Sequence, residues 1–290
     1  MRKTRLSVFP ILILAIGMAG QPSLAQQGTA VELNTLLMQS TFLIQGGDQA
    51  GTAFVLGRPV RNDPLKARYV MITAAHVLQG IPGEQAILHV RVEQGGSQWN
   101  RVPVPIKIRD RGHELWTKHP AADVAVMYVG LPKEVVIPLV STNLFADDAR
   151  LSAFEIHPGD EVNSLGYPLG EASNPAGFPI LRSGKIASYP LLPTRETRTF
   201  LMDFRVFKGN SGGPVYLVQS SRTYGSGVRL GQTVALLLGL VSGERLQAQQ
   251  VVGPYSAELR ELQLGLAVVV HASLIIEAIN LLPPPDEILK

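Results

Sequence analysis

At residues 209–214 the chain reads Gly-Asn-Ser-Gly-Gly-Pro, a serine set among glycines. A serine hydroxyl is a poor nucleophile unless a base takes its proton and hydrogen-bond donors stabilise the resulting oxyanion. Glycine permits the tight turn that would expose Ser211 and direct backbone amides at one point. The alternative is an ordinary glycine-rich turn between two strands. The apolar segments on either side favour a nucleophile.

A base and an acid that suit this serine lie upstream. His76 follows the apolar run 69–72, and the small residues Ala74 and Ala75 leave its imidazole room to approach a nucleophile. Asp123 opens a second apolar run, where an unpaired buried carboxylate would be costly and a histidine N–H would satisfy it. Taken alone, a histidine at a strand end is more often structural. Together, in the order His, Asp, Ser, the three predict a catalytic triad.

Strand patterns dominate the rest of the chain. Residues 88–92 and 102–108 alternate apolar and polar side chains, as half-buried strands do. Residues 69–72, 124–129 and 234–241 are apolar on both faces, which indicates buried strands. Because short strands recur between turn residues, the sequence predicts an all-β protein built of sandwiches or barrels.

Helices are few in this interpretation. The clearest covers residues 274–282, with Ser273 as its N-cap and the prolines from Pro283 as its stop. A weaker candidate covers residues 31–38.

Three stretches lack a clear strand pattern. Residues 131–158 are predicted to connect two similar halves of the chain. The polar stretches 220–232 and 244–262 are predicted to be long surface loops near the serine, where they would shape substrate access.

With these motifs in place, the chain resembles the trypsin-like serine proteases, especially the bacterial Deg/HtrA-type branch. The resemblance runs from about Gly51 to Leu282, and several short segments look like strands of that family: Gly51-Thr52-Ala53-Phe54-Val55, Gly159-Asp160-Glu161-Val162, Leu165-Gly166-Tyr167-Pro168, Ser183-Gly184-Lys185-Ile186 and Gly265-Leu266-Ala267-Val268. It implies two packed six-stranded β-barrels with the active site between them and a short C-terminal helix. The barrels would occupy residues 26–140 and 141–282, followed by a tail at 283–290.

The resemblance also implies roles for single residues. His76, Asp123 and Ser211 would form the triad, and the amides of Gly209 and Ser211 would form the oxyanion hole. The pocket for the residue before the cut would be lined by Arg205, Val206, Val241, Ser242, Gly243 and Gly265.

The expected pocket differs from that of trypsin, which needs an acid at the position of Arg205 to bind Lys or Arg. Val206 and Val241 would narrow and dry the pocket, which favours small or medium aliphatic side chains. An acidic preference follows instead if Arg205 points inward. If Arg205 turns out to solvent, it sets no preference.

Three further departures from the family pattern affect these expectations. Asn210 stands where pancreatic-type enzymes carry the aspartate that pairs with a new N-terminus, so we expect no activating cleavage. Only eight residues follow Leu282, so no peptide-binding PDZ domain is expected. The polar stretch 244–262 lengthens the region beside the substrate-binding strand and would alter substrate access.

The N-terminal residues 1–25 have the pattern of a signal peptide. Arg2, Lys3 and Arg5 precede the apolar run 6–20, and Ser23-Leu24-Ala25 supplies the small residues of a cleavage site after Ala25. A membrane anchor is the alternative, but the run is short and has no basic stop. We therefore expect an exported protein, periplasmic or secreted, with no stable membrane anchor after cleavage.

Charge and composition narrow the remaining functions. Three of the 26 basic residues and none of the 23 acidic residues lie in the signal segment, so the rest of the chain is balanced and shows no electrostatic footprint for nucleic acid. The chain has no cysteine, which excludes disulfides and a lipoprotein anchor. No spaced cluster of metal ligands and no phosphate-binding motif occurs, so no metal or cofactor is expected.

Two functions remain after these exclusions. The first is an exported serine endopeptidase that hydrolyses polypeptide substrates through an acyl-enzyme. The second is a protease-like peptide-binding or chaperone module with little turnover. A complete triad argues for the first, because binding alone gives no reason for all three side chains. The sequence does not indicate the oligomeric state.

Overall fold

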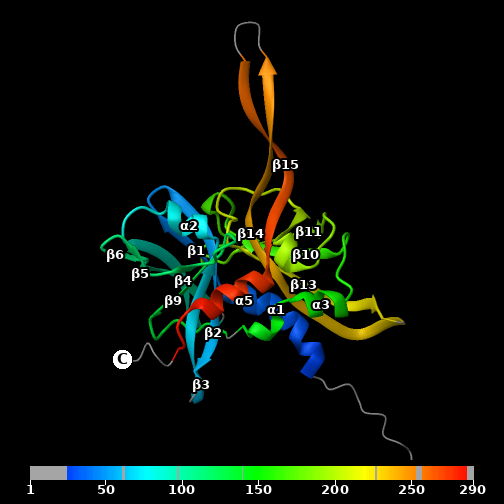
Figure 1. Ribbon diagram of the computed structural model, residues 1–290. Helices are drawn as coiled ribbons and strands as arrows, with labels where there is room; N and C mark the ends of the chain where they lie inside the picture. Colours follow the sequence, from blue (N-terminus) through cyan, green and yellow to red (C-terminus); the bar gives the residue numbers. More distant parts are fainter. Residues whose placement is uncertain are drawn as a thin grey trace, which may run out of the picture.

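The computed structural model describes residues 25–60, 63–96, 98–138, 140–225, 227–252 and 257–285. The expected signal peptide lies outside the described residues, apart from Ala25. Among the described residues, no helix is both long and apolar enough to cross a membrane. The molecule consists of two β-structures side by side, with one long hairpin projecting from the second (Figure 1).

The first β-structure is a seven-stranded sheet with strand order β5-β4-β1-β2-β3-β9-β8. The predicted alternating strands at 88–92 and 102–108 pair with each other, with Val90 opposite Val102. A short pair, β6 and β7, stands apart from this sheet. The strands are β1 (Thr41–Gly46), β2 (Gln49–Val60), β3 (Asp63–Thr73), β4 (Gln85–Gly95), β5 (Gln98–Lys107), β6 (Arg109–Asp110), β7 (His113–Glu114), β8 (Thr117–Lys118) and β9 (Ala125–Tyr128).

The second β-structure is a closed barrel of six strands in the order β10-β11-β12-β15-β14-β13. Its members are β10 (Glu161–Gly166), β11 (Ile180–Ile186), β12 (Thr199–Asp203), β13 (Pro214–Tyr224), β14 (Gly227–Val252) and β15 (Ala257–His271). The predicted all-β class with a short C-terminal helix is thereby confirmed. The sheet of the N-terminal half has seven strands, one more than the six that were expected.

The helices are short apart from the first and last. They are α1 (Ala25–Ser40), α2 (Ala75–Gly80), α3 (Asp148–Ala153), α4 (Thr194–Thr197) and α5 (Ala272–Leu281), with 3₁₀ turns η1 (Thr142–Leu144) and η2 (Pro168–Gly170). The weak helix prediction at 31–38 is confirmed within α1. The predicted capping role of Ser273 is wrong. Helix α5 starts after His271 without a side-chain cap, and the Ser273 hydroxyl donates instead to Thr194 Oγ1 at 2.9 Å.

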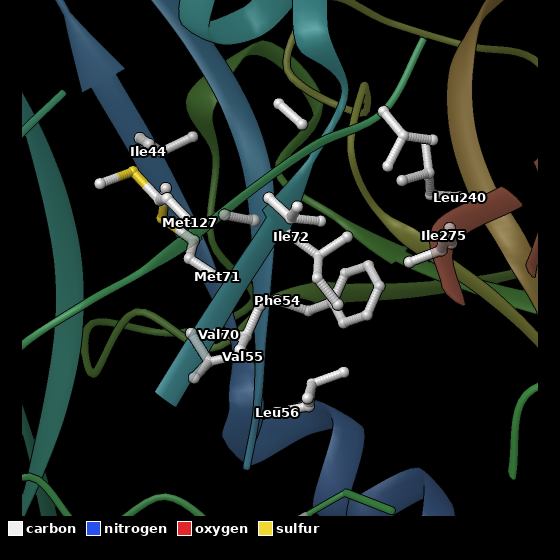
Figure 2. Close-up of a cluster of buried hydrophobic side chains, with 14 of the residues drawn as sticks. Ile44, Phe54, Val55, Leu56, Val70, Met71, Ile72, Met127, Leu240 and Ile275 are labelled. Atoms are coloured by element: carbon white, nitrogen blue, oxygen red, sulfur yellow. The ribbon is translucent and has the colours of Figure 1, made fainter. Parts of the chain in front are cut away.

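The hydrophobic core forms two clusters. One fills the barrel. The other lies on the seven-stranded sheet and includes residues of the second half. In Figure 2, Phe54 and Ile72 of the sheet accompany Leu240 of β14 and Ile275 of α5. Because α5 buries its apolar face in the cluster of the first sheet, the C-terminal helix ties the two halves together.

The prediction of long polar loops at 220–232 and 244–262 is wrong. Where the structure describes these stretches, they are strands of two hairpins, with Ser221 opposite Leu230 and Gln247 opposite Leu262. The β14–β15 hairpin extends well beyond the barrel (Figure 1). A two-stranded ribbon that leaves the body has no sheet face to bury, so its sequence lacks the alternation by which half-buried strands are recognised.

Candidate active site

His76 is presented by a strand-to-helix turn. Strand β3 ends at Thr73, two fully buried alanines follow, and α2 begins at Ala75. Small side chains at Ala74 and Ala75 let the turn pack closely, so that the next side chain emerges at the surface. The His76 side chain is 48% exposed.

Asp123 holds His76 by two hydrogen bonds. The His76 backbone amide donates to Asp123 Oδ1 at 3.0 Å, and the ring nitrogen Nδ1 lies 2.6 Å from Asp123 Oδ2. An ionised carboxylate only accepts hydrogen bonds, so the proton sits on Nδ1 and leaves Nε2 with a free lone pair. This is the tautomer that a general base requires.

The local environment keeps Asp123 ionised. Burial alone would raise the pKa of its carboxyl group, but hydrogen bonds from His76 and Ser242 outweigh burial and hold the pKa below its ordinary value. The Ser242 hydroxyl donates to Asp123 Oδ2 at 2.6 Å.

Ser242 reaches Asp123 because it sits on a β-bulge. Val241 lies opposite Val269 and Gly243 lies opposite Val268, so Ser242 is the extra residue of strand β14. A bulge changes the direction of a side chain and occurs often beside active sites. Ser242 was predicted to line the substrate pocket, and its contact with Asp123 was not predicted.

Ser211 lies beside the same bulge. Its hydroxyl donates to the Ser242 carbonyl at 3.2 Å. Among the described residues, it makes no hydrogen bond to the His76 ring. Serine hydroxyls rotate freely, and catalytic hydrogen bonds are often formed only when substrate is bound. Ser242 therefore links the two residues, since its hydroxyl bonds Asp123 and its carbonyl bonds Ser211.

The turn before Ser211 has the geometry of an oxyanion-binding loop. The amide of Asn210 donates to the Phe207 carbonyl at 3.0 Å, and Gly209, the third residue of this turn, has φ +100°. A type II turn requires a positive φ at that position. A Cβ atom on Gly209 would lie 2.1 Å from the Tyr167 carbonyl oxygen, so only glycine fits.

The two amides expected to bind the oxyanion belong to Gly209 and Ser211. Neither donates a hydrogen bond to another described residue. One is the amide of the candidate nucleophile itself, and the other lies two residues before it on the tight turn. Converging free amides can stabilise negative charge on a substrate carbonyl oxygen.

Some of the residues expected to line the specificity pocket are buried, and Arg205 is exposed. Val206 and Val241 are buried in the cluster that fills the barrel. Arg205 is exposed, stacks on Phe207 with its guanidinium 5.2 Å from the ring centre, and reaches Gln263 Oε1 at 3.4 Å. Its charge is therefore directed toward β15 and solvent.

The two glycines of the expected pocket lie on neighbouring strands. Gly243 follows the bulge in β14, and Gly265 of β15 has φ +70° and accepts a hydrogen bond from the Phe204 amide at 3.0 Å. At either glycine a Cβ atom would meet open space.

A cavity of about 320 Å³ lies beside the nucleophile turn, on the side of η2 and the turn between β1 and β2. It is lined by Gln45, Gly47, Asp48, Gln49, Ala50, Leu169, Gly170 and Lys208. Within the described part of the chain, no group of three or more His, Cys, Asp or Glu residues is placed to hold a metal ion.

Comparisons with known proteins bear on these features. None of the curated proteins matches the sequence. Solved structures with a similar fold include two inactive forms of Rv3671c from M. tuberculosis. Each is 19% identical to this chain, and each match covers 94% of the Rv3671c chain. The matches cover 90% and 87% of this chain, with TM-scores of 0.44 and 0.42. Protease Anisep from Arthrobacter nicotinovorans is 14% identical over 83% of this chain and 94% of its own, with a TM-score of 0.45.

The sequence also matches a family model. The model of the trypsin-like peptidase domain matches residues 51–225, which is more than half of the chain. This range contains His76, Asp123 and Ser211, as well as the turn that precedes the serine. The protein belongs to the family of trypsin-like peptidase domains and is a serine peptidase.

Proposed function

We propose that the protein is an exported serine endopeptidase in which His76, Asp123 and Ser211 form the catalytic triad. The observation that carries the proposal is the set of short contacts at one point. Asp123 fixes the His76 tautomer, Ser242 bonds both Asp123 and Ser211, and the amides of Gly209 and Ser211 make no hydrogen bond to another described residue.

The proposed reaction has two halves. The Ser211 hydroxyl oxygen attacks the scissile carbonyl carbon while His76 Nε2 takes its proton, and the amides of Gly209 and Ser211 bind the oxyanion. His76 then gives the proton to the leaving amine, the C–N bond breaks, and the acyl group stays on Ser211. Water attacks this ester with His76 again as base, which releases the acid and restores the serine.

Polypeptides are the proposed substrates, and export rests on the signal-peptide pattern of residues 1–25. The preference for small or medium aliphatic side chains before the cut stays a prediction. The exposed position of Arg205 fits the alternative in which this residue sets no preference.

A fluorophosphonate probe tests the proposal directly, because it reacts only with a serine that has an assembled base and oxyanion hole. We expect the purified protein, beginning near Gln26, to be labelled at Ser211. Ser211→Ala should abolish labelling and lower kcat by about 10⁶. Ser152→Ala, which removes an exposed serine hydroxyl on α3, is the matched control and should change neither. Near-normal proteolysis by Ser211→Ala would show that the nucleophile is wrongly assigned.

One observation favours the second candidate, a peptide-binding module with little turnover. The Ser211 hydroxyl is bonded to the Ser242 carbonyl at 3.2 Å and not to the base. The same experiment separates the two functions, since a binding module would capture peptides without reacting with the probe.

A further inference from the structure

Thr52 on β2 is hydrogen-bonded to three residues of the second half of the chain, Tyr167, Gly209 and Ser211. It is fully buried, and its hydroxyl accepts a hydrogen bond from the Tyr167 amide at 3.2 Å and donates one to the Gly209 carbonyl at 2.7 Å. Its own amide donates to the Ser211 carbonyl at 2.8 Å. One residue of the first sheet therefore contacts the two residues whose amides would bind the oxyanion.

The same residue is tied to the segment that carries the base. The Thr73 hydroxyl donates to the Thr52 carbonyl at 2.7 Å, and Thr73 is the last residue of β3, three positions before His76. Thr52 thus lies between the end of the strand that presents the base and the turn that presents the nucleophile.

The peptide groups around Gly209 are held from two sides. The Thr52 hydroxyl donates to the Gly209 carbonyl. The Leu169 amide donates to the Lys208 carbonyl at 2.6 Å, and this carbonyl belongs to the same peptide group as the Gly209 amide. Leu169 lies two residues after Tyr167, whose amide is bonded to Thr52. The Thr52 hydroxyl therefore makes one of these two supports directly and bonds the segment that carries the other.

The backbone around Thr52 is closely packed. A Cβ atom on Gly212 would lie 2.0 Å from the Thr52 carbonyl oxygen and 2.3 Å from Thr73 Oγ1, and one on Gly209 would lie 2.1 Å from the Tyr167 carbonyl oxygen. Backbone packed this closely admits no water between the groups. Loss of the hydroxyl alone would leave the Tyr167 amide and the Gly209 carbonyl buried without it.

We propose that Thr52 is a positioning residue that sets the oxyanion turn relative to the base through its side-chain hydroxyl. It acts through Gly209 and does not touch the substrate. This inference rests on the proposed serine endopeptidase function, in which the Gly209 amide binds the oxyanion. A displacement of about 1 Å in such a group is enough to slow a reaction about 10²-fold.

The test compares Thr52→Val, which keeps the shape and removes the hydroxyl, with Thr52→Ser, which keeps the hydroxyl. We expect Thr52→Val to lower kcat per titrated active site by about 10- to 100-fold, with KM changed less than about 3-fold. Thr52→Ser should restore kcat to within about 3-fold of the original protein. A purely structural threonine would lower the melting temperature without this split between kcat and KM.

Thr194 offers the matched control, because it is also buried and its hydroxyl bonds Asp148, away from the site. Thr194→Val should lower the melting temperature and leave kcat per active site unchanged. If Thr52→Val does not fold, Thr52→Ala and Thr52→Ser make the same comparison of one hydroxyl. Equal kcat values with and without the hydroxyl overturn the proposal. If the original protein is not labelled at Ser211, the proposed function itself fails, which is a different result.

Discussion

At the scale of single residues, Asp123 governs the state of the base. It receives hydrogen bonds from the His76 amide, the His76 ring and the Ser242 hydroxyl, and these hold its pKa below the ordinary value despite burial. The carboxylate therefore stays charged in weak acid. In the proposed mechanism it holds the Nδ1 proton of His76 and stabilises the imidazolium that forms during attack.

Asp123→Asn tests this role with little change in shape. An amide group offers an N–H as well as an oxygen, so it allows the tautomer in which His76 carries its proton on Nε2, where it cannot act as base. We expect kcat to fall by roughly 10⁴, measured with a peptide substrate. Ser242→Ala, which removes one of the hydrogen bonds to Asp123, should have a much smaller effect. An Asp123→Asn protein with at least a tenth of the original kcat would contradict the assignment.

The sequence indicated candidate residues for the site but not their contacts. His76, Asp123 and Ser211 were predicted because each stands at a recognisable strand end or glycine turn, and their catalytic roles stay a prediction. The contact of Ser242 with Asp123 depends on a bulge in β14, whose register no local pattern indicates. The contacts of Thr52 join it to Gly209 and Ser211, which lie more than 150 positions away along the chain, so they exist only in the folded chain.

At the scale of elements, Arg91 joins the N-terminal helix to both β-structures. It lies on β4, is 2% exposed, and donates to the carbonyls of Met38, Gln39, Thr41 and Gly177 and to the Tyr167 hydroxyl. The Phe42 and Phe178 rings lie on it at 4.5 and 4.4 Å. Burial lowers the pKa of this guanidinium below its ordinary value.

Replacing Arg91 should loosen this junction. Arg91→Met keeps an apolar stem between the rings but removes five hydrogen bonds from a charged donor, each worth about 1.5–3 kcal/mol at most. We expect the free energy of unfolding to fall by about 3 kcal/mol or more, measured by urea denaturation. Arg195→Met is the control, because Arg195 is 83% exposed with one side-chain ion pair, and it should change stability by less than about 0.5 kcal/mol. An unchanged midpoint for Arg91→Met would show that the junction contributes nothing to stability.

Elements were predictable where burial leaves a pattern. The strands of the sheet and of the barrel have one face in a core, so alternation or continuous apolar runs identified them. The outer parts of β13, β14 and β15 are held by main-chain pairing and were mistaken for loops. The start of α5 was displaced because Ser273, a typical capping residue, bonds Thr194 instead.

At the scale of the whole molecule, the two halves are joined by shared core and by buried polar groups. His271 is a buried polar group at the end of the barrel. It ends β15, precedes α5, and is 1% exposed with its ring 5.0 Å from that of Phe200. Burial lowers its pKa to about 4, although the charge of Asp148 acts in the opposite direction. The folded protein therefore keeps this histidine neutral well into the acid range.

The consequence is a loss of stability in acid. Between about pH 6.5, where an unfolded histidine titrates, and about pH 4, the unfolded chain binds a proton that the folded chain does not. Stability is then full above about pH 6.5 and falls as the pH is lowered, by about 3 kcal/mol for a shift of this size. His89, whose pKa is also lowered to about 4 by burial and the nearby Arg101, adds less because it is partly exposed.

Urea denaturation at pH 7 and pH 4.5 measures this dependence. We expect His271→Phe, which keeps a ring against Phe200 but cannot be protonated, to lose about 2–3 kcal/mol less stability between the two pH values than the original protein. His113→Gln removes an exposed histidine and should keep the original pH dependence. Equal losses for His271→Phe and the original protein would mean that His271 is not the group that makes the fold sensitive to acid. His271 stands where the last barrel strand passes into the helix that packs on the first sheet, so the group under test lies at the connection between the two halves.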